Sequence, residues 1–258
     1  MTPQQIPVST NTRAPDGRTN AYVLGSDDAL LVDPATLTDD LHDVISDRHV
    51  GHVAVTHHHP DHVGAVAEAA RTFDLTVWAR AGHEREFAAA TGVDPDRTFS
   101  PGETLPVADG VPVVDTPGHA SEHVAFVVDD GLVSGDLAVA EGSVVVGTPG
   151  GDMRAYLSSL RRVHARAPDN LYPGHGPVVD DPRATCSRLI AHRLQRERTV
   201  GRAVTEEGAM TPDDIVDAAY EKDVSAVRDL ARATVVAHLE KLAIEGQVRW
   251  DGERASPV

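Results

Sequence analysis

Histidine and aspartate side chains gather in one short segment of the sequence. Residues 56–62 read THHHPDH and directly follow an apolar run. If the backbone stays extended, His57 and His59 point to the same side, while Asp61 and His62 fall at the turn and can face a second centre. Because imidazole and carboxylate groups bind divalent metal ions, the segment predicts a metal site. An exposed, His-rich loop with incidental metal affinity is the alternative.

Three further residues lie in comparable surroundings downstream. His119 ends the segment DTPGH, Asp136 ends SGD, and His175 lies within YPGHGP, and each segment follows an apolar run. The neighbouring glycines and prolines allow tight turns and a close approach of the backbone. A buried histidine or aspartate without a partner is costly, and a bound cation satisfies it. Four strand ends that supply such residues indicate ligands converging on one sheet edge, which argues against the exposed-loop alternative.

Short strands and alanine-rich helices would have to position these residues. Apolar β-branched runs predict strands, and residues 25–28 and 129–131 have the composition of hairpin turns. Strands dominate, with helices interspersed, which predicts two mixed sheets covered by helices. The expected strands are 21–24, 29–32, 52–55, 75–78, 111–115, 124–128, 132–134 and 170–172, and the expected helices are 63–73, 84–90 and 153–165.

A change of composition marks a second unit in the C-terminal part. Residues 183–203 are rich in arginine and predict one long connecting helix, whose arginines either line a phosphate path or form a solvated face. Thr211 and Pro212 then have the types expected of an N-cap and a first helical residue. An apolar stripe from Val227 to Leu242 and a terminal strand complete a unit that resembles a winged helix. The expected domains are 1–182, 183–203 and 204–258.

Composition limits the chemistry and the environment. The one cysteine, Cys186, excludes an intrachain disulfide and a thiolate cluster, so any metal site must use imidazole and carboxylate. Acidic residues outnumber basic ones by 40 to 23, which gives a formal net charge of −17. This diffuse excess resembles the surfaces of proteins from salt-loving archaea, with an ordinary acidic cytosolic protein as the alternative. We expect stability to rise with salt, because salt screens the self-repulsion.

The charge balance also bears on partners. The C-terminal unit is acidic, which argues against binding of duplex DNA, since phosphate contacts need positive charge. We interpret this unit as an oligomerisation or cleft-covering module, so a homo-oligomer is one of the expected possibilities. Residues 1–12 lack the apolar core of a leader peptide, and no run is long enough to span a bilayer. We therefore expect a cytoplasmic protein with no membrane partner.

The motifs together resemble those of the metallo-β-lactamase superfamily over roughly residues 19–180. Asp33 in the segment LVDP, the His-x-His-x-Asp-His signature and the three downstream residues occur in the order of that family. The resemblance implies an α/β fold, a four-layer αββα sandwich followed by a small winged-helix-like module. The sequence also resembles the lactamase-β-2-like branch of that superfamily. Four features that occur together in this branch are present, namely the segments Gly17–Tyr22 and Tyr156–Leu160, the PGHGP turn and the C-terminal unit. Members of that branch are described as endoribonucleases, thioesterases or uncharacterised hydrolases.

The resemblance also assigns roles to residues. It implies that one metal ion is bound by His57, His59 and His119, the other by Asp61, His62 and His175, and that Asp136 bridges them. Asp33 is interpreted as an anchor behind the ligands rather than a ligand. His58 occupies a variable position of the signature, so its side chain should point away from the metals. His123 either hydrogen-bonds near the site or has a structural role.

We therefore expect a hydrolase with two divalent metal ions, with zinc as the expected metal. Two ions about 3.5–4 Å apart would share a hydroxide whose pKa falls to near 7. Asp61, the expected catalytic residue, would also orient this hydroxide for attack on an ester, thioester or phosphodiester of a small molecule. One alternative is an endoribonuclease acting on single-stranded RNA, which the net charge disfavours. The other is a metal-binding regulator with a DNA-binding winged helix, which the full ligand set and the acidic module disfavour.

Overall fold

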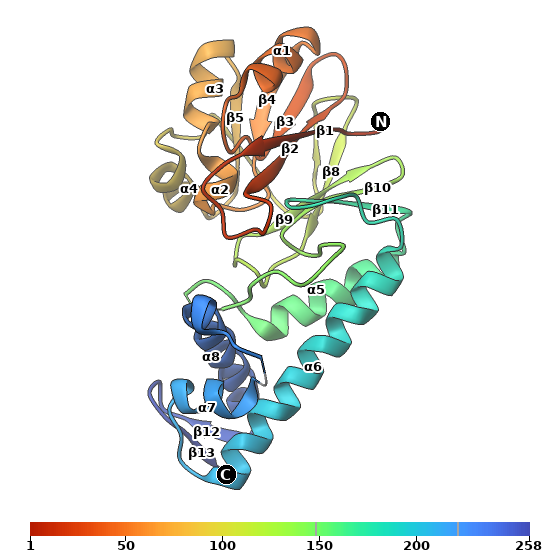
Figure 1. The fold of residues 1–258 in the computed structure, drawn as a ribbon. Coiled ribbons are helices and arrows are strands. Elements are labelled where there is room, and N and C mark those ends of the chain that lie inside the picture. Colours follow the sequence, from red (N-terminus) through yellow and green to blue (C-terminus); the bar gives the residue numbers. More distant parts are fainter. Residues whose placement is uncertain (148, 221) are drawn as a thin grey trace.

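The computed structural model describes residues 1–147, 149–220 and 222–258. Two β-sheets face each other, and helices cover both outer faces (Figure 1). The first sheet runs in sequence order through β1 (Gln4–Ser9), β2 (Arg18–Leu24), β3 (Ala29–Val32), β4 (Val50–Ala54), β5 (Thr76–Arg80) and β6 (Arg97–Phe99). The second runs through β11 (Asn170–Pro173), β10 (Gly131–Gly135), β9 (Val124–Val128), β8 (Val111–Asp115) and β7 (Thr104–Leu105). This is the predicted four-layer αββα arrangement.

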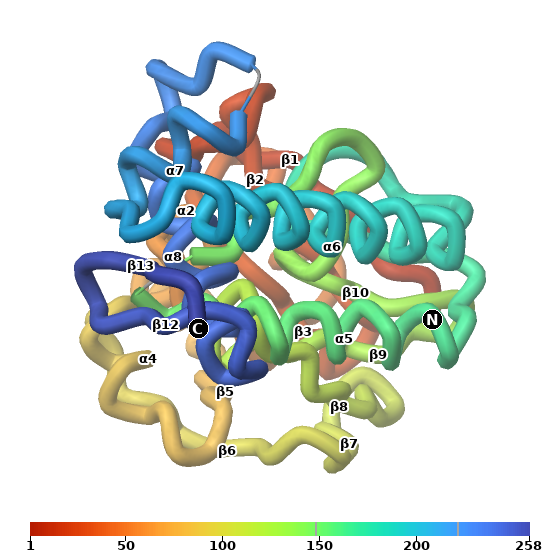
Figure 2. Tube along the Cα trace, turned by 90° about the horizontal axis from the view of Figure 1, so that it is seen from below, coloured from red at the N-terminus to blue at the C-terminus, as the bar shows by residue number. Residues whose placement is uncertain are grey.

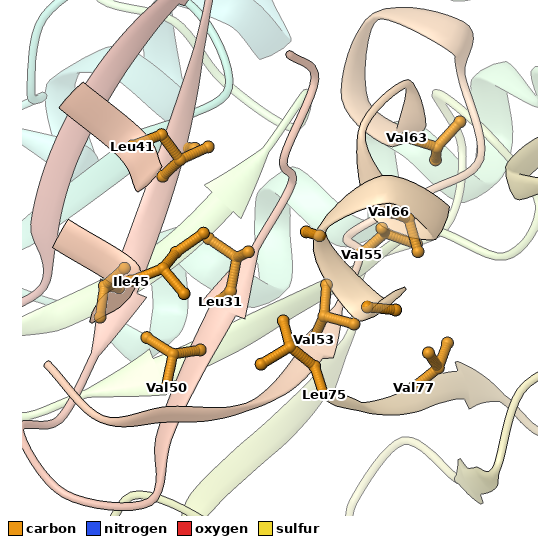
Figure 3. Close-up of a cluster of buried hydrophobic side chains, with 14 of the residues drawn as sticks. Leu31, Leu41, Ile45, Val50, Val53, Val55, Val63, Val66, Leu75 and Val77 are labelled. Carbon is orange, nitrogen blue, oxygen red and sulfur yellow. The ribbon is translucent and has the colours of Figure 1, made fainter. Parts of the chain in front are cut away.

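Alternation along β2 and β3 builds two hydrophobic layers at once. Because successive side chains of a strand point to opposite faces, Val23 and Leu31 lie under the helices, whereas Tyr22 and Leu30 lie between the sheets. Figure 3 shows the layer under the helices, where strand side chains such as that of Leu31 meet side chains of the covering helices. The helices on this side are α1 (Asp39–Asp47), α2 (Pro60–Val63), α3 (Val66–Phe73) and α4 (Glu84–Thr91).

Two helices cover the outer face of the second sheet. They are α5 (Met153–Arg166) and α6 (Pro182–Glu207), which run side by side (Figures 1 and 2). Tyr156, Leu157 and Leu160 of α5 are fully buried against this sheet and α6. A third hydrophobic layer therefore fixes α6 to the second sheet and α5.

The C-terminal unit is assembled on the far half of α6. Val200 and Val204 of α6 are fully buried together with Val235 and Leu239 of the unit. The side chain of Thr211 caps the first helix of the unit, as the sequence predicted. The unit comprises α7 (Pro212–Ala219), the 3₁₀ turn η1 (Ser225–Val227), α8 (Arg228–Ile244), β12 (Val248–Trp250) and β13 (Ala255–Pro257).

The predicted elements overlap observed ones, with several corrections. The connecting helix is longer than the predicted 183–203, and the predicted helix 63–73 is broken at Gly64, where a Cβ would lie 2.5 Å from the carbonyl oxygen of Ala35. β1, β6, β7, β13 and α1 were not predicted. Among the described residues, no helix is both long and apolar enough to cross a bilayer.

Candidate metal centre

Loops at one end of the two sheets bring the seven predicted ligands together. Their nitrogen and oxygen atoms form overlapping groups whose members lie within 4.8 Å of one another. We call His57, His59 and His119 the first triad, and Asp61, His62 and His175 the second triad. Asp136 joins His57 and His62 in a group between them.

Three imidazole nitrogens converge in the first triad. Nδ1 of His59 lies 3.0 Å from Nε2 of His57 and 2.8 Å from Nε2 of His119. Around a tetrahedral zinc ion with Zn–N bonds of 2.0–2.1 Å, neighbouring nitrogens lie about 3.3 Å apart. The spacing in the first triad therefore suits one shared cation.

Hydrogen bonds fix which nitrogen two of these histidines present. Nδ1 of His119 donates to the carbonyl oxygen of Val145, at 2.6 Å. Nδ1 of His57 lies 3.0 Å from Oγ1 of Thr56, whose own proton is donated to Asp33. Both rings thus turn an Nε2 lone pair toward the centre. Burial and the neighbouring imidazoles lower the pKa of His57, and burial together with His119 lowers the pKa of His59 to about 4, so both rings are uncharged at neutral pH.

The second triad mixes carboxylate and imidazole. Nε2 of His175 lies 3.6 Å from Oδ2 of Asp61, and Nδ1 of His175 donates to the carbonyl oxygen of Arg18 at 2.8 Å. Burial alone would lower the pKa of His175, but the hydrogen bond and charge of Asp136 raise it to about 9. Burial also opposes protonation of His62, yet the carboxylates around it raise its pKa. In the absence of a cation, protons therefore neutralise this part of the centre.

Asp136 lies between the triads. Its Oδ1 is 3.5 Å from Nε2 of His62, and its Oδ2 is 3.5 Å from Nε2 of both His119 and His175. Burial would raise the pKa of Asp136, but His62 and the other imidazoles hold it far below its usual range. A Cβ on Gly174 would lie 2.5 Å from Oδ1 of Asp136, so glycine is needed there to admit the carboxylate.

Two buried atoms between the triads indicate whether a cation fits there. Among the described residues, Oδ1 of Asp136 and Nε2 of His62 are both buried and have no hydrogen-bond partner. Such orphaned buried groups are rare, because their desolvation is not compensated. A cation bound between them would satisfy both, so the residues present are able to bind metal.

Asp33 connects the backs of the two triads. Its Oδ1 accepts from the backbone N–H of Thr56 at 2.7 Å, and its Oδ2 accepts from Oγ1 of Thr56 at 2.7 Å and from Nδ1 of His62 at 3.0 Å. Both carboxylate oxygens are thus occupied, as expected for an anchor rather than a ligand. Asp33 holds a left-handed backbone conformation, with φ of +54°, at the end of β3.

The two other histidines of this region have separate environments. His58 points away from the ligands, as predicted, since its ring lies 5.6 Å from that of Phe87 and its backbone N–H donates to Glu122. Nε2 of His123 accepts from the backbone N–H of Asp136 at 3.1 Å. Nδ1 of His123 therefore carries the proton and faces Oγ1 of Thr116 at 2.8 Å. Burial, with the charge of His119, lowers the pKa of His123 to about 3, so it supports the loop of Asp136 as a neutral ring.

Two contacts of the ligands were missed from sequence. Oγ1 of Thr12 donates to Oδ2 of Asp61 at 2.5 Å, across 49 positions of sequence. The carbonyl oxygen of Val145 orients His119 across 26 positions. A lone threonine in a polar loop and a backbone carbonyl give no sequence signal, whereas Thr56 at least adjoins the signature.

A cavity of about 650 Å³ opens beside the centre. Asp61, His119, Asp136 and His175 line one end of it, together with His59. Its other walls come from the segments 12–16, 139–145 and 175–177, from Gly147 and Pro149, and from Leu230 and Ala233 of α8. A small-molecule site of this size is ordinary for an enzyme, since ligand pockets measure roughly 300–1,000 Å³.

Two arginines of α6, Arg188 and Arg193, support a wall of this cavity instead of forming a charged path for phosphates. The guanidinium of Arg188 donates to the carbonyl oxygens of Val139, Ala140 and Gly142. Arg193, which is 3% exposed, donates to the carbonyl oxygen of Val144. Buried Arg193 thus belongs neither to a phosphate path nor to the expected solvated face, and both arginines fix the loop that forms a cavity wall.

Comparisons with known proteins agree with this geometry. A family model described as the metallo-beta-lactamase superfamily matches residues 14–175, and one described as a beta-lactamase associated winged helix domain matches residues 211–255. The Beta-lactamase-like protein 2 homolog of Drosophila melanogaster is 30% identical over 254 residues, which are 90% of this chain and 84% of that protein. The atrochrysone carboxyl ACP thioesterase dmxR1 of a Cryptosporiopsis species is 24% identical over 258 residues, 90% of this chain and 77% of that protein.

Solved structures share the fold. A beta-lactamase domain protein from Burkholderia ambifaria superposes with a TM-score of 0.83 at 23% identity, over 99% of this chain and 91% of that one. The protein TTHA1623 in a di-iron-bound form has a TM-score of 0.55 at 29% identity, over 68% of this chain and 94% of that one.

Proposed function

This chain belongs to the metallo-beta-lactamase superfamily and is a hydrolase, and from this we infer the reaction that it catalyses. We propose that it hydrolyses thioesters of small molecules with the help of two divalent metal ions. The first triad would hold one ion, the second triad the other, and Asp136 would contact both. When bound, the ions supply Lewis acidity and lower the pKa of water to near 7.

One observation carries this proposal. Two groups of ligands share a buried carboxylate at the end of a cavity whose walls are mainly apolar. An apolar cavity suits an uncharged acyl group better than a polyanion. Relatives named atrochrysone carboxyl ACP thioesterase match over 90% of this chain and over 76–77% of their own length, and their name supports the same reaction class here.

The side chains of the chain itself have separable tasks. Asp61 lines the cavity and is held by the hydroxyl of Thr12, so we assign it the positioning of the attacking water and the acceptance of its proton. His175 lies beside Asp61 and keeps its orientation through the carbonyl oxygen of Arg18. Water and the thioester together yield a carboxylic acid and a thiol, so no further reactant is needed.

Zinc is the metal that we propose, because three imidazoles, two of them with tautomers fixed by hydrogen bonds, suit a tetrahedral ion without redox chemistry. The di-iron form of TTHA1623 makes iron the competing metal. Elemental analysis of the gently purified full chain decides between the two metals and should find about two ions per chain, as a two-metal site requires.

The reaction is tested with a substrate panel. Acyl thioesters of N-acetylcysteamine, p-nitrophenyl esters, a bis-p-nitrophenyl phosphodiester and labelled single-stranded RNA are offered to the full chain, with and without chelator. We expect thioesters to give the highest kcat/KM and chelator to abolish it. Cleavage of RNA with no thioester turnover would replace the proposal with the endoribonuclease alternative. Full activity in chelator would remove the metals from the reaction.

A further inference from the structure

Helix α8 presents two apolar faces to different parts of the molecule. Ala231, Val235 and Leu239 are buried within the C-terminal unit. Leu230, Ala233 and Ala237 follow one another at spacings of three and four and therefore share another face. Ala237 is buried with the side chains of α5, whereas Leu230 and Ala233 are half-buried and line the cavity beside the metal centre. The C-terminal unit thus contributes a wall to the active-site cavity.

The loop that contains Gly147 packs directly against α8, next to this wall. A Cβ on Gly147 would lie 2.6 Å from Cβ and 2.9 Å from the carbonyl carbon of Ala233, so only glycine lets the loop lie directly against the helix. Arg188 and Arg193 hold the preceding residues of the loop through their carbonyl oxygens. The cavity wall is therefore held in place from two sides.

The N-terminal segment joins the same wall to the metal centre. The guanidinium of Arg13 contacts both carboxylate oxygens of Asp229 in α8, at 3.0 and 3.2 Å. The preceding residue, Thr12, donates to Asp61 of the second triad. Arg13 is the only arginine or lysine among the described cavity-lining residues, and its charge is already paired.

The lining between these supports is mainly apolar, although Glu141 and Ser143 of the loop also contribute to it. Val139, Val144 and Val145 come from the loop, and Leu230 and Ala233 from α8. Uncharged groups gain free energy when such surfaces are removed from water, by about 0.8 kcal/mol for each buried methylene. A substrate with an extended apolar group therefore matches this cavity better than a short or charged one.

We propose that the cavity binds a medium-length or longer apolar acyl group of the substrate, and that Leu230 and Ala233 of α8 are specificity-determining residues that limit its size. This inference rests on the proposed function of the same site and adds to it the chemical class of the acyl group. It gives the C-terminal unit a direct part in substrate choice.

The test measures binding separately from turnover. The probes are two thioethers of N-acetylcysteamine, S-octyl and S-ethyl, which lack the scissile carbonyl and cannot be cleaved. Isothermal titration calorimetry on the full, metal-loaded chain should show the S-octyl probe binding at least about tenfold more tightly, because it buries more methylenes. Leu230→Trp, which fills the cavity, should reduce this affinity ratio about tenfold, in keeping with overpacking of a fitted site.

Two further variants control the result. Ile244→Trp places the same bulky ring on α8 at a side chain that is 65% exposed and outside the cavity lining, and it should keep the wild-type ratio. Leu230→Gln keeps the length of the side chain without its apolarity, so it should also lower the ratio even if Leu230→Trp does not fold. Circular dichroism reports the folding of each variant.

The outcomes separate this inference from the proposed reaction. Equal affinity of the wild type for both probes would overturn the inference, and so would an equal change of the ratio in Leu230→Gln and Ile244→Trp. The expected binding pattern without any thioester cleavage would support the apolar site while contradicting the proposed reaction. Thioester cleavage without chain-length discrimination would do the reverse.

Discussion

The two triads use similar side chains under opposite electrostatic conditions. In the first triad, imidazoles face one another, and burial with these neighbours lowers the pKa of His57 and His59. In the second, imidazoles face carboxylates, and the pKa of His62 and His175 is raised. A cation would therefore meet uncharged rings at His57 and His59 of the first triad, but it would have to displace protons in the second. The placement of carboxylates, rather than the number of histidines, sets how each half of the centre receives a cation.

The largest expected effect comes from removing the carboxylate of the second triad that faces the cavity. Asp61→Ala should lower kcat/KM for thioester cleavage about 10³-fold, because a positioned acid–base group contributes about 10²–10⁴-fold. The first triad is untouched, so the metal content should fall from about two ions per chain to about one. Steady-state kinetics and elemental analysis measure these two quantities.

The matched control is another carboxylate of the same cavity. Asp16 also lines the cavity but belongs to neither triad, so Asp16→Ala should keep the wild-type metal content. If Asp61→Ala kept both ions and full turnover, the second triad would not contain the catalytic carboxylate, and the contrast between the triads would have no bearing on the reaction.

A smaller effect is expected from the residues behind the triads. Asp33→Asn loses an acceptor for Nδ1 of His62, so the cation of the second triad should bind about 10–100-fold more weakly, as is usual when an outer partner of a ligand is removed. Thr56→Val is the counterpart for the first triad, because it removes the acceptor for Nδ1 of His57. Competition with chelating dyes measures the two affinities. Identical losses in both variants would mean that the triads bind as one unit.

The residues that converge in the two triads were predictable from sequence because they are local or tied to turns. The signature places its ligands within seven residues, and glycine or proline marks the turns of His119 and His175. The partners that orient the ligands were not predictable to the same degree. Thr12 reaches Asp61 only after β1 and β2 have paired. The partner of His119 is the backbone carbonyl of Val145, and because every residue has a backbone carbonyl, the residue type gives no sign of this contact.

The fold class followed from hydrophobic alternation, and the errors have physical causes. β1 was missed because only Ile6 and Val8 are apolar and buried, and Pro7 between them is tolerated because the strand lies at the sheet edge. The stripe of α8 was seen as one face. Periodicity identifies buried positions, but it does not say that Val235 packs within the unit while Leu230 faces the cavity.

The difference in proton content predicts a difference in proton release. Near neutral pH, His175 is protonated because its pKa is about 9, whereas His59 is not because its pKa is about 4. Binding of a cation to the second triad should therefore release protons, and this release should decline as the pH rises through about 9. His57 and His59 of the first triad should release none. Calorimetric titration of metal-free protein in buffers of different ionisation enthalpy counts the protons, and His175→Gln should reduce the count.

The smallest expected effect concerns the residue that lies between the first two ligands in sequence but outside the triad in space. His58 is mostly buried against Phe87, with Nδ1 3.8 Å from Oε1 of Glu122, and burial lowers its pKa. His58→Ala should keep both the metal content and kcat/KM at the wild-type value. It should lower the melting temperature, because a point substitution typically costs about 1 kcal/mol. Elemental analysis and thermal unfolding check these values. Loss of one ion per chain would mean that His58, not a neighbour, completes the first triad, and the pKa contrast between the triads would then have been drawn from the wrong residues.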